Sequence, residues 1–227
     1  MPAPDPPTAT DMAEQFIHEH GGAIVKAGLK GDLPQDALDA AQDLTGALGD
    51  VIGAGKQLEN DRAELARRRD LLPVDGYSRL LNEANEEAIT KTREAESAAN
   101  RAYARLETTL EDATLPRFNP AREQLARDEA ALALSNGNPE SAALQFARHG
   151  NDEAVADALA LGEDVAALSR RATNPERLMA DARKIAVDRA KQGDTVAARA
   201  LREHCPKLGA AKGSAGSTVR RLNPYRL

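Results

Sequence analysis

Tryptophan is absent from the 227-residue sequence, cysteine occurs once (Cys205), and aromatic residues make up only 3%. A single cysteine excludes an intramolecular disulfide and favours a cytoplasmic protein or one inside a particle assembled there. Because aromatic side chains are so scarce, a core has to be built from aliphatic and alanine side chains. The composition therefore favours an all-α protein.

Long apolar runs are also missing. No stretch approaches the ~20 apolar residues that a membrane-spanning helix needs. Residues 1–7, MPAPDPP, lack the basic and apolar regions of a secretory signal. We therefore expect neither a membrane segment nor a secretion signal.

Complete catalytic motifs are lacking too. The segment 49–57, GDVIGAGKQ, superficially resembles a phosphate loop, but Asp50 stands where the first glycine is required and Gln57 replaces the serine or threonine. Cys205 precedes Pro206 at the expected end of a helix, where the helix dipole disfavours a thiolate. We therefore predict no catalytic residue and no enzymatic activity.

Metal and cofactor sites are not indicated either. His18 and His20 are two residues apart, which places them on different faces of a helix, and His204 beside Cys205 has no second pair of ligands. A di-metal carboxylate bundle needs histidines on facing helices, and residues 34–113 contain none. The sequence predicts no metal and no cofactor.

What the sequence does contain is a long helical hairpin. Residues 34–113 are predicted to form two nearly equal arms joined at residues 73–76. Pro73 cannot continue the first helix, and Asp75 can accept hydrogen bonds from the free amides that open the second. In each arm, steps of four and three residues trace one seam, which is typical of a helix that packs along a partner.

The first seam comprises Leu44, Leu48, Val51, Leu58 and Leu65, with Gly55 and Arg62 as interruptions. The second comprises Tyr77, Leu81, Ala84, Ala88, Lys91, Ala95, Ala98 and Ala102. The second seam is mostly alanine, and small side chains allow close helix approach. We predict that the two seams form the helix-packing interface of a coiled-coil-like hairpin.

The first arm contains Gly46, Gly49, Gly53 and Gly55, each of which costs about 1 kcal/mol relative to alanine inside a helix. One interpretation is a loop between two shorter helices. The other is a continuous helix in which three of these glycines share one face and admit a neighbouring helix closely.

Beyond the hairpin, the sequence predicts a series of short helices. Asparagine followed by proline at 119–120, 138–139 and 174–175 is typical of a helix start, and glycines follow the apolar runs as stop signals. The expected helices span about 120–135, 139–149, 152–161, 163–171, 175–192 and 195–204. The intervals between starts are unequal, which favours an irregular helical cluster over a solenoid of repeats.

These patterns predict four regions: a flexible N-terminal arm with a short helix (1–33), the hairpin (34–116), the short-helix cluster (117–206) and a flexible basic tail (207–227). The hairpin carries ten basic and seventeen acidic residues, whereas the tail carries five basic residues and no acid. We predict that the tail docks on a protein partner through Arg220, Arg221, Leu222, Tyr225 and Arg226. The acidic body argues against nucleic acid as the main partner.

An acidic, alanine-rich helical hairpin followed by a basic C-terminal peptide, RRLNPYR at 220–226, resembles the layout of tailed-bacteriophage assembly and virion proteins, particularly scaffold-like or head-to-tail proteins. The resemblance implies that residues 34–113 organise an oligomer and that residues 207–227 contact capsid or portal proteins. It also implies a location in the host cytoplasm or the virion. The alternative hypothesis is a bacterial cytosolic adaptor or regulator whose helical cluster binds a protein partner.

Overall fold

The computed structural model describes residues 8–135, 138–162 and 173–221, and these residues form helices without a strand. The predicted all-α class is therefore confirmed. The chain forms two compact units, residues 1–109 with 200–227 and residues 110–199. This division differs from the predicted one, because the C-terminal segment belongs to the unit that contains the hairpin. None of the helices described is long and apolar enough to cross a membrane.

The first unit begins with a helical stretch made of α1 (Ala9–Phe16), the π-helical segment η1 (Ile17–Gly21) and α2 (Gly22–Leu29). A capping box opens α1: the Asp11 amide donates to Thr8 Oγ1 at 3.2 Å, and the Thr8 amide donates to Asp11 Oδ2 at 2.9 Å. After α2 the chain turns through Gly31, whose φ of 78° is accessible to glycine without strain. The stretch packs on α3 and α11, described next.

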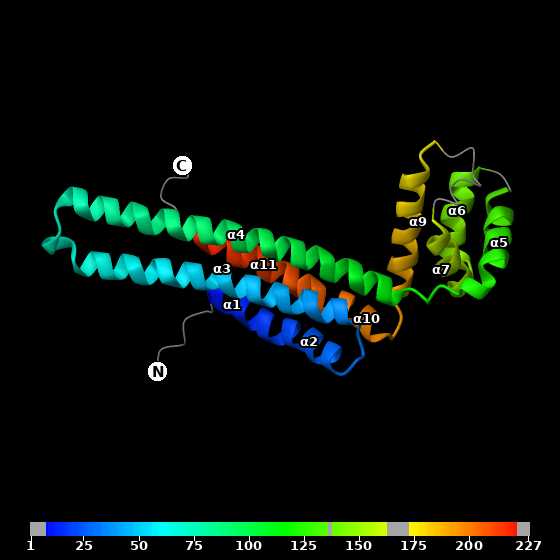
Figure 1. Cartoon of the computed structure of the whole chain (residues 1–227), viewed down its shortest axis with the longest axis horizontal. Coiled ribbons are helices and arrows are strands. Elements are labelled where there is room, and N and C mark those ends of the chain that lie inside the picture. Colours follow the sequence, from blue (N-terminus) through cyan, green and yellow to red (C-terminus); the bar gives the residue numbers. More distant parts are fainter. Residues whose placement is uncertain (1–7, 136–137, 163–172, 222–227) are drawn as a thin grey trace. The chain divides into compact units, whose positions relative to one another are not determined.

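The hairpin consists of α3 (Gln35–Arg67) and α4 (Val74–Thr114), joined by the 3-10 turn η2 (Arg69–Leu71) and Pro73. Figure 1 shows the two arms running side by side in opposite directions. α3 continues without a break through all four glycines, so the loop interpretation of the first arm is excluded. The turn between the two arms lies at residues 68–73, next to Pro73, as the sequence predicted.

The buried faces of the two arms differ in how closely they follow the predicted seams. Leu44, Leu48, Val51 and Leu58 of α3 are at most 2% exposed. On the part of α4 that belongs to this unit, residues 74–109, the buried positions are Asn85, Ala88, Thr92, Ala99, Ala102 and Leu106. The predicted Lys91 is exposed, and Ala84, Ala95 and Ala98 are half-buried. The face of α4 is therefore rotated by about one residue from the prediction.

The cause of this rotation is a helix that the sequence analysis did not predict. After α10 (Val196–Arg199), which belongs to the second unit, the π-helical segment η4 (Ala200–His204) leads into α11 (Cys205–Arg221). α11 packs on α1 and α3, and it also meets α4, where the Tyr103 hydroxyl donates to the Cys205 carbonyl at 3.3 Å. α4 thus has two partners within its unit, and its buried face lies between them.

The prediction of a flexible tail is wrong for residues 207–221. These residues form the body of α11, and Leu208, Ala211 and Ala215 are at most 2% exposed. Pro206 does not end the helix, because the wider π-helical turn of η4 directly precedes it and relieves the clash that proline makes with the preceding turn. Arg220 and Arg221 lie in the last turn of α11, whereas Leu222, Tyr225 and Arg226 lie outside the described residues.

The second unit contains the 3-10 turn η3 (Pro120–Arg122) and the helices α5 (Glu123–Ser135), α6 (Pro139–His149), α7 (Asp152–Leu161) and α9 (Pro175–Ala190). The predicted starts are confirmed, since Asn138 Oδ1 accepts from the Glu140 amide at 3.0 Å and Asn174 Oδ1 accepts from the Arg177 amide at 3.0 Å. Ala130 and Ala158 form a small core with Phe146 and Leu161. The helix predicted at 163–171 lies outside the described residues.

Candidate functional site

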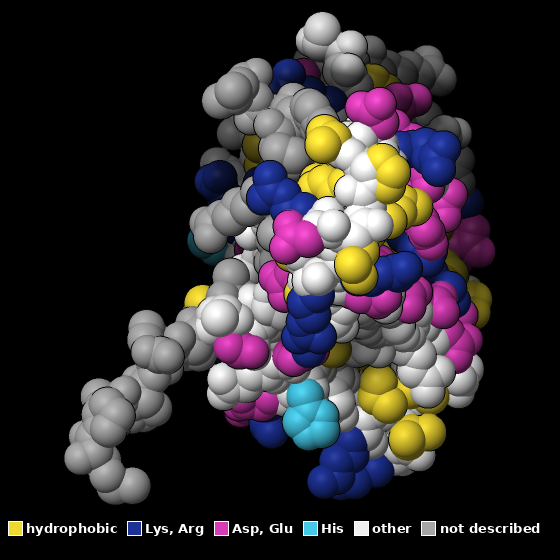
Figure 2. Space-filling view, turned by 90° about the vertical axis from the view of Figure 1, so that its left-hand side faces the viewer, with side chains coloured by type: hydrophobic (Ala, Val, Ile, Leu, Met, Phe, Trp, Pro, Cys, Tyr) yellow, Lys and Arg dark blue, Asp and Glu magenta, His cyan; other side chains and the backbone are white. Residues whose placement is uncertain are grey.

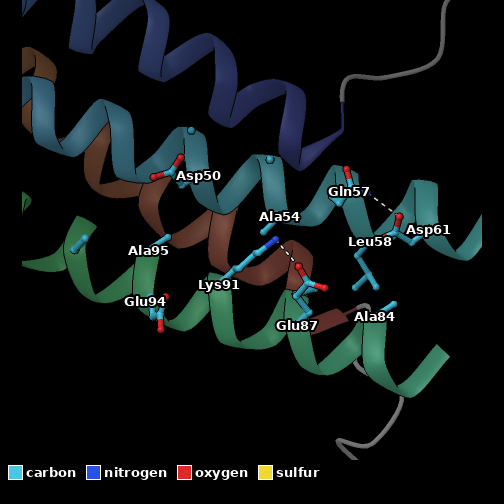
Figure 3. A pocket seen from close by; sticks show the side chains of 14 residues that line it. Asp50, Ala54, Gln57, Leu58, Asp61, Ala84, Glu87, Lys91, Glu94 and Ala95 are labelled. Atoms are coloured by element: carbon cyan, nitrogen blue, oxygen red, sulfur yellow. Dashed lines mark hydrogen bonds and ion pairs between the residues drawn. The ribbon is translucent and has the colours of Figure 1, made fainter. Parts of the chain in front are cut away.

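In the first unit, a groove with a volume of about 620 Å³ lies between α3 and α4 (Figure 3). α3 contributes one wall from Gly49 to Asp61, and α4 contributes the other from Ala84 to Ala98. The arms are tied together at both ends of this stretch. At one end, Arg62 Nη2 donates to Asn85 Oδ1 at 2.6 Å, and beyond the other end Arg105 Nη1 lies 3.4 Å from Asp43 Oδ2.

Small side chains line most of the groove. Its apolar lining consists of Gly49, Gly53, Ala54, Leu58, Ala84, Ala88, Ala95 and Ala98. A Cβ atom added at Gly49 or Gly53 would meet no heavy atom within 4 Å, so this face of α3 is open. The sequence predicted that a neighbouring helix packs on this glycine face. No helix in the described part of the chain does so.

Charged side chains flank the small ones, and most are acidic. Asp50 and Asp61 lie on α3, Glu87 and Glu94 lie on α4, and Lys91 is the one basic residue among the described residues of the lining. Figure 3 shows Lys91 reaching along α4 to Glu87, with Nζ 2.6 Å from Oε1. The hydrogen bond and the charge of Lys91 lower the pKa of Glu87, and the same contact raises the pKa of Lys91. At neutral pH the groove thus carries an excess of negative charge.

Among the described residues, the lining of the groove offers carboxylates, an amide, one amine and small apolar side chains, and no serine, threonine, cysteine or histidine. The amine of Lys91 is held protonated by Glu87 and so is a poor nucleophile. In the described parts of both units, no three or more His, Cys, Asp and Glu side chains gather as a metal site would require.

Only some of the predicted interface residues line this groove. Leu58, Ala88 and Ala95 line it, while Leu44, Leu48, Val51 and Ala102 are buried elsewhere in the unit. Leu65 and Leu81 are half-buried near the hairpin turn. Of the predicted docking residues, Arg220 and Arg221 belong to α11, and Leu222, Tyr225 and Arg226 are outside the described residues.

The sequence did not point to the acidic side chains of the lining, among them Glu87 and Glu94, as part of a site. A signal for it exists. Glu87 and Glu94 are seven residues apart, as are Asp50 and Gln57, so each pair recurs on one helix face beside the small residues. Which helix face remains open could not be read from the sequence, because it depends on where α11 packs.

A second exposed apolar surface lies at the hairpin turn. Leu71 and Val74 are 83% and 82% exposed. Figure 2 views the molecule from the hairpin end and shows hydrophobic side chains lying among basic and acidic ones.

Comparison with known proteins gave no match: no family model fits the chain, and no curated protein or solved structure matches it significantly. The assignment of function therefore rests on the geometry of the groove and on the sequence.

Proposed function

We propose that the chain is a non-enzymatic structural or assembly protein that holds a helix of a protein partner in the groove between α3 and α4. The observation that carries the proposal is the open, small-residue lining of this groove. Helices pack with their axes about 8–10 Å apart, and the shorter distances require small side chains at the contact. Gly49, Gly53 and the alanines of α4 meet that requirement.

The negative charge of the lining determines which partner helices can bind in the groove. Four carboxylates and one ion-paired lysine favour a partner helix with basic residues beside a small apolar face. A second hairpin of this chain would bring acidic walls together, so the groove favours a different partner segment over another hairpin. The stretch from Gly49 to Asp61 is roughly 18 Å long, which matches about three turns of helix.

The specific setting that we propose is a tailed-phage virion or a capsid in assembly, with capsid or portal proteins as partners and with oligomers of this chain as the assembling unit. The support is the layout of an acidic, alanine-rich hairpin with a basic C-terminal segment. Stoichiometric amounts of the chain in purified phage particles are the expected result of quantitative mass spectrometry. Its absence from particles and from capsid precursors contradicts this setting but leaves the groove proposal intact.

Groove binding can be tested with a synthetic helical peptide of about four turns (~14 residues), with alanine on one face and lysine and arginine beside it. Gly53→Leu fills the groove, whereas Gly46→Leu adds the same side chain on open surface outside the lining. We expect saturable binding to the native chain and to the Gly46 variant, and loss of binding in the Gly53 variant, measured by fluorescence anisotropy. An acidic peptide of the same alanine pattern should not bind.

Equal binding of the basic peptide to both leucine variants would place the contact outside the groove. Equal binding of the basic and acidic peptides would exclude the charge argument.

The second candidate function is a cytosolic adaptor that binds its partner through the second unit. One observation favours it: Leu125 and Leu132, seven residues apart on α5, are 50% and 66% exposed. Substituting both by serine should abolish partner binding by an adaptor and leave groove binding of the basic peptide unchanged.

A further inference from the structure

The two most exposed large hydrophobic side chains in the described part of the chain both lie at the turn of the hairpin. Leu71 ends η2 and Val74 begins α4, and they are 83% and 82% exposed. Figure 2 shows hydrophobic side chains at this end of the molecule among basic and acidic ones. Large apolar side chains that gather at one exposed place mark an interaction surface.

This surface, residues 67–74, is also basic, and we call it the tip. Its charged residues are Arg67, Arg68, Arg69 and Asp70. Arg68 pairs with Glu64 at 3.3 Å, but both side chains are more than half exposed, so the pair is weak and leaves the guanidinium accessible. The Arg69 guanidinium lies 5.8 Å from the centroid of the Tyr77 ring, which favours a position beside the turn.

The groove between α3 and α4 has complementary properties. Small side chains leave it open, and its four carboxylates outnumber Lys91, which already pairs with Glu87 at 2.6 Å (Figure 3). Two grooves placed face to face repel each other. The tip instead brings arginines to the carboxylates and two aliphatic side chains to the small apolar lining, and opposite charges on two surfaces favour their association.

The tip cannot reach the groove of its own chain. Asp61, at the end of the groove wall, and Arg67, at the start of the tip, lie on the same continuous helix α3. Six residues of helix separate them by roughly 9 Å along the axis, so the tip points away beyond the end of the groove. The tip that enters a groove has to come from another copy of the chain.

We propose that the tip of one copy docks in the groove of a second copy, with Leu71 and Val74 against the small side chains around Gly53. This inference rests on the proposed binding role of the groove and names an occupant for it. Because tip and groove are different surfaces, the contact is heterologous, and copies add head to tail into a ring or an open chain. The tip therefore competes with a basic partner helix for the groove.

The test is sedimentation velocity of the full chain over a range of concentrations, at low and high NaCl. We expect association beyond a dimer that weakens as salt screens the charges. Leu71→Ser with Val74→Ser (the tip variant) and Gly53→Leu (the groove variant) should each weaken self-association by more than about tenfold, since burial of one aliphatic side chain contributes about that factor. Leu29→Ser, at a leucine 71% exposed outside the tip, and Gly46→Leu are the controls and should associate like the native chain.

A mixture of the tip variant and the groove variant tests the head-to-tail geometry. Each variant keeps one intact surface, so the mixture should form a one-to-one dimer and nothing larger. Because Leu71 and Val74 are exposed, their replacement leaves the fold intact, which circular dichroism checks.

A monomeric native chain, unchanged association of the tip variant, association that salt does not weaken, or a mixture that stays monomeric overturns the proposal. The basic peptide described above needs the groove but no tip. Its binding to a native chain that remains monomeric would therefore overturn the tip contact alone and leave the proposed function of the groove in place.

Discussion

At the scale of single residues, the buried face of α4 contains polar groups with incomplete hydrogen bonding. Asn85 and Thr92 are 3% and 4% exposed, and in the described part of the chain neither Asn85 Nδ2 nor Thr92 Oγ1 has a hydrogen-bond partner. A buried polar group without a partner costs about 1–3 kcal/mol. We therefore expect these two residues to make the hairpin less stable than aliphatic side chains at the same positions would.

Thr92→Val should therefore stabilise the first unit. Valine has nearly the shape of threonine and removes the unpaired hydroxyl, so we expect a gain of about 1 kcal/mol in the free energy of unfolding, measured by urea denaturation. Thr108→Val, at an exposed position of the same helix, is the control and should change little. Destabilisation by Thr92→Val would mean that the hydroxyl is satisfied in solution.

The capping box at Thr8 and Asp11 makes the start of α1 sensitive to pH. Hydrogen bonds from the Thr8 amide and the Thr8 hydroxyl lower the pKa of Asp11 below its unfolded value. Its contribution is thus fully present above that unfolded value, about 3.9, and is lost as the pH falls through the lowered folded value. Faster amide exchange in α1 below about pH 4, absent in Asp11→Asn, is the expected result.

Contradiction would come from an identical pH dependence of α1 exchange in the native chain and in Asp11→Asn. The effect would then belong to another carboxylate.

At the scale of elements, the glycines of the first unit divide into two kinds. Gly49 and Gly53 face open space, whereas Gly21 lies against Thr45. Gly53→Ala should stabilise α3 by up to about 1 kcal/mol, because alanine is the better helix former and meets no neighbour. Gly21→Ala should destabilise the unit, since its methyl group has no room. Thermal unfolding of the two variants gives the comparison, and a common sign would contradict the assigned contacts.

The C-terminal helix should behave as part of the core. Leu208 is fully buried, so Leu208→Ala should lower the free energy of unfolding by about 2–5 kcal/mol. The exposed Leu132 provides a control, and its replacement by alanine should have little effect. A neutral Leu208→Ala would restore the interpretation of residues 207–221 as a detached tail.

Comparison of the elements shows which sequence signals were sufficient. Local chemistry predicted the turn at Pro73 and the caps at Asn138 and Asn174, because these residues act on their own neighbours. Tertiary contacts decided the rest. The sequence predicts a helix end at Pro206, yet the π-helical turn η4 accommodates this proline, and the buried face of α4 lies partly toward α11. The sequence predicted the small residues of the groove as packing positions. It could not predict that the Nδ1 atoms of His20 and His204 lie 3.1 Å apart, because 184 residues separate the two histidines.

At the scale of the whole molecule, the two units differ in continuity. The second unit is one continuous segment, 110–199, whereas the first is built from both ends of the chain. A fragment of residues 110–199 should therefore fold by itself, with helical circular dichroism and cooperative thermal unfolding. A fragment of residues 1–109 lacks α11 and should be less stable than the same residues in the full chain. A fully helical, equally stable 1–109 fragment would contradict this division.

The split construction of the first unit has a consequence for its synthesis. α11 begins about 90 residues after α4 ends, so at about 5–20 residues per second a ribosome reaches it roughly 5–20 s later. During that interval α1, α3 and α4 emerge with the apolar faces that α11 will cover still exposed. A nascent chain therefore presents binding surface to chaperones, and a message truncated before codon 205 yields a product that cellular proteases can recognise as incomplete.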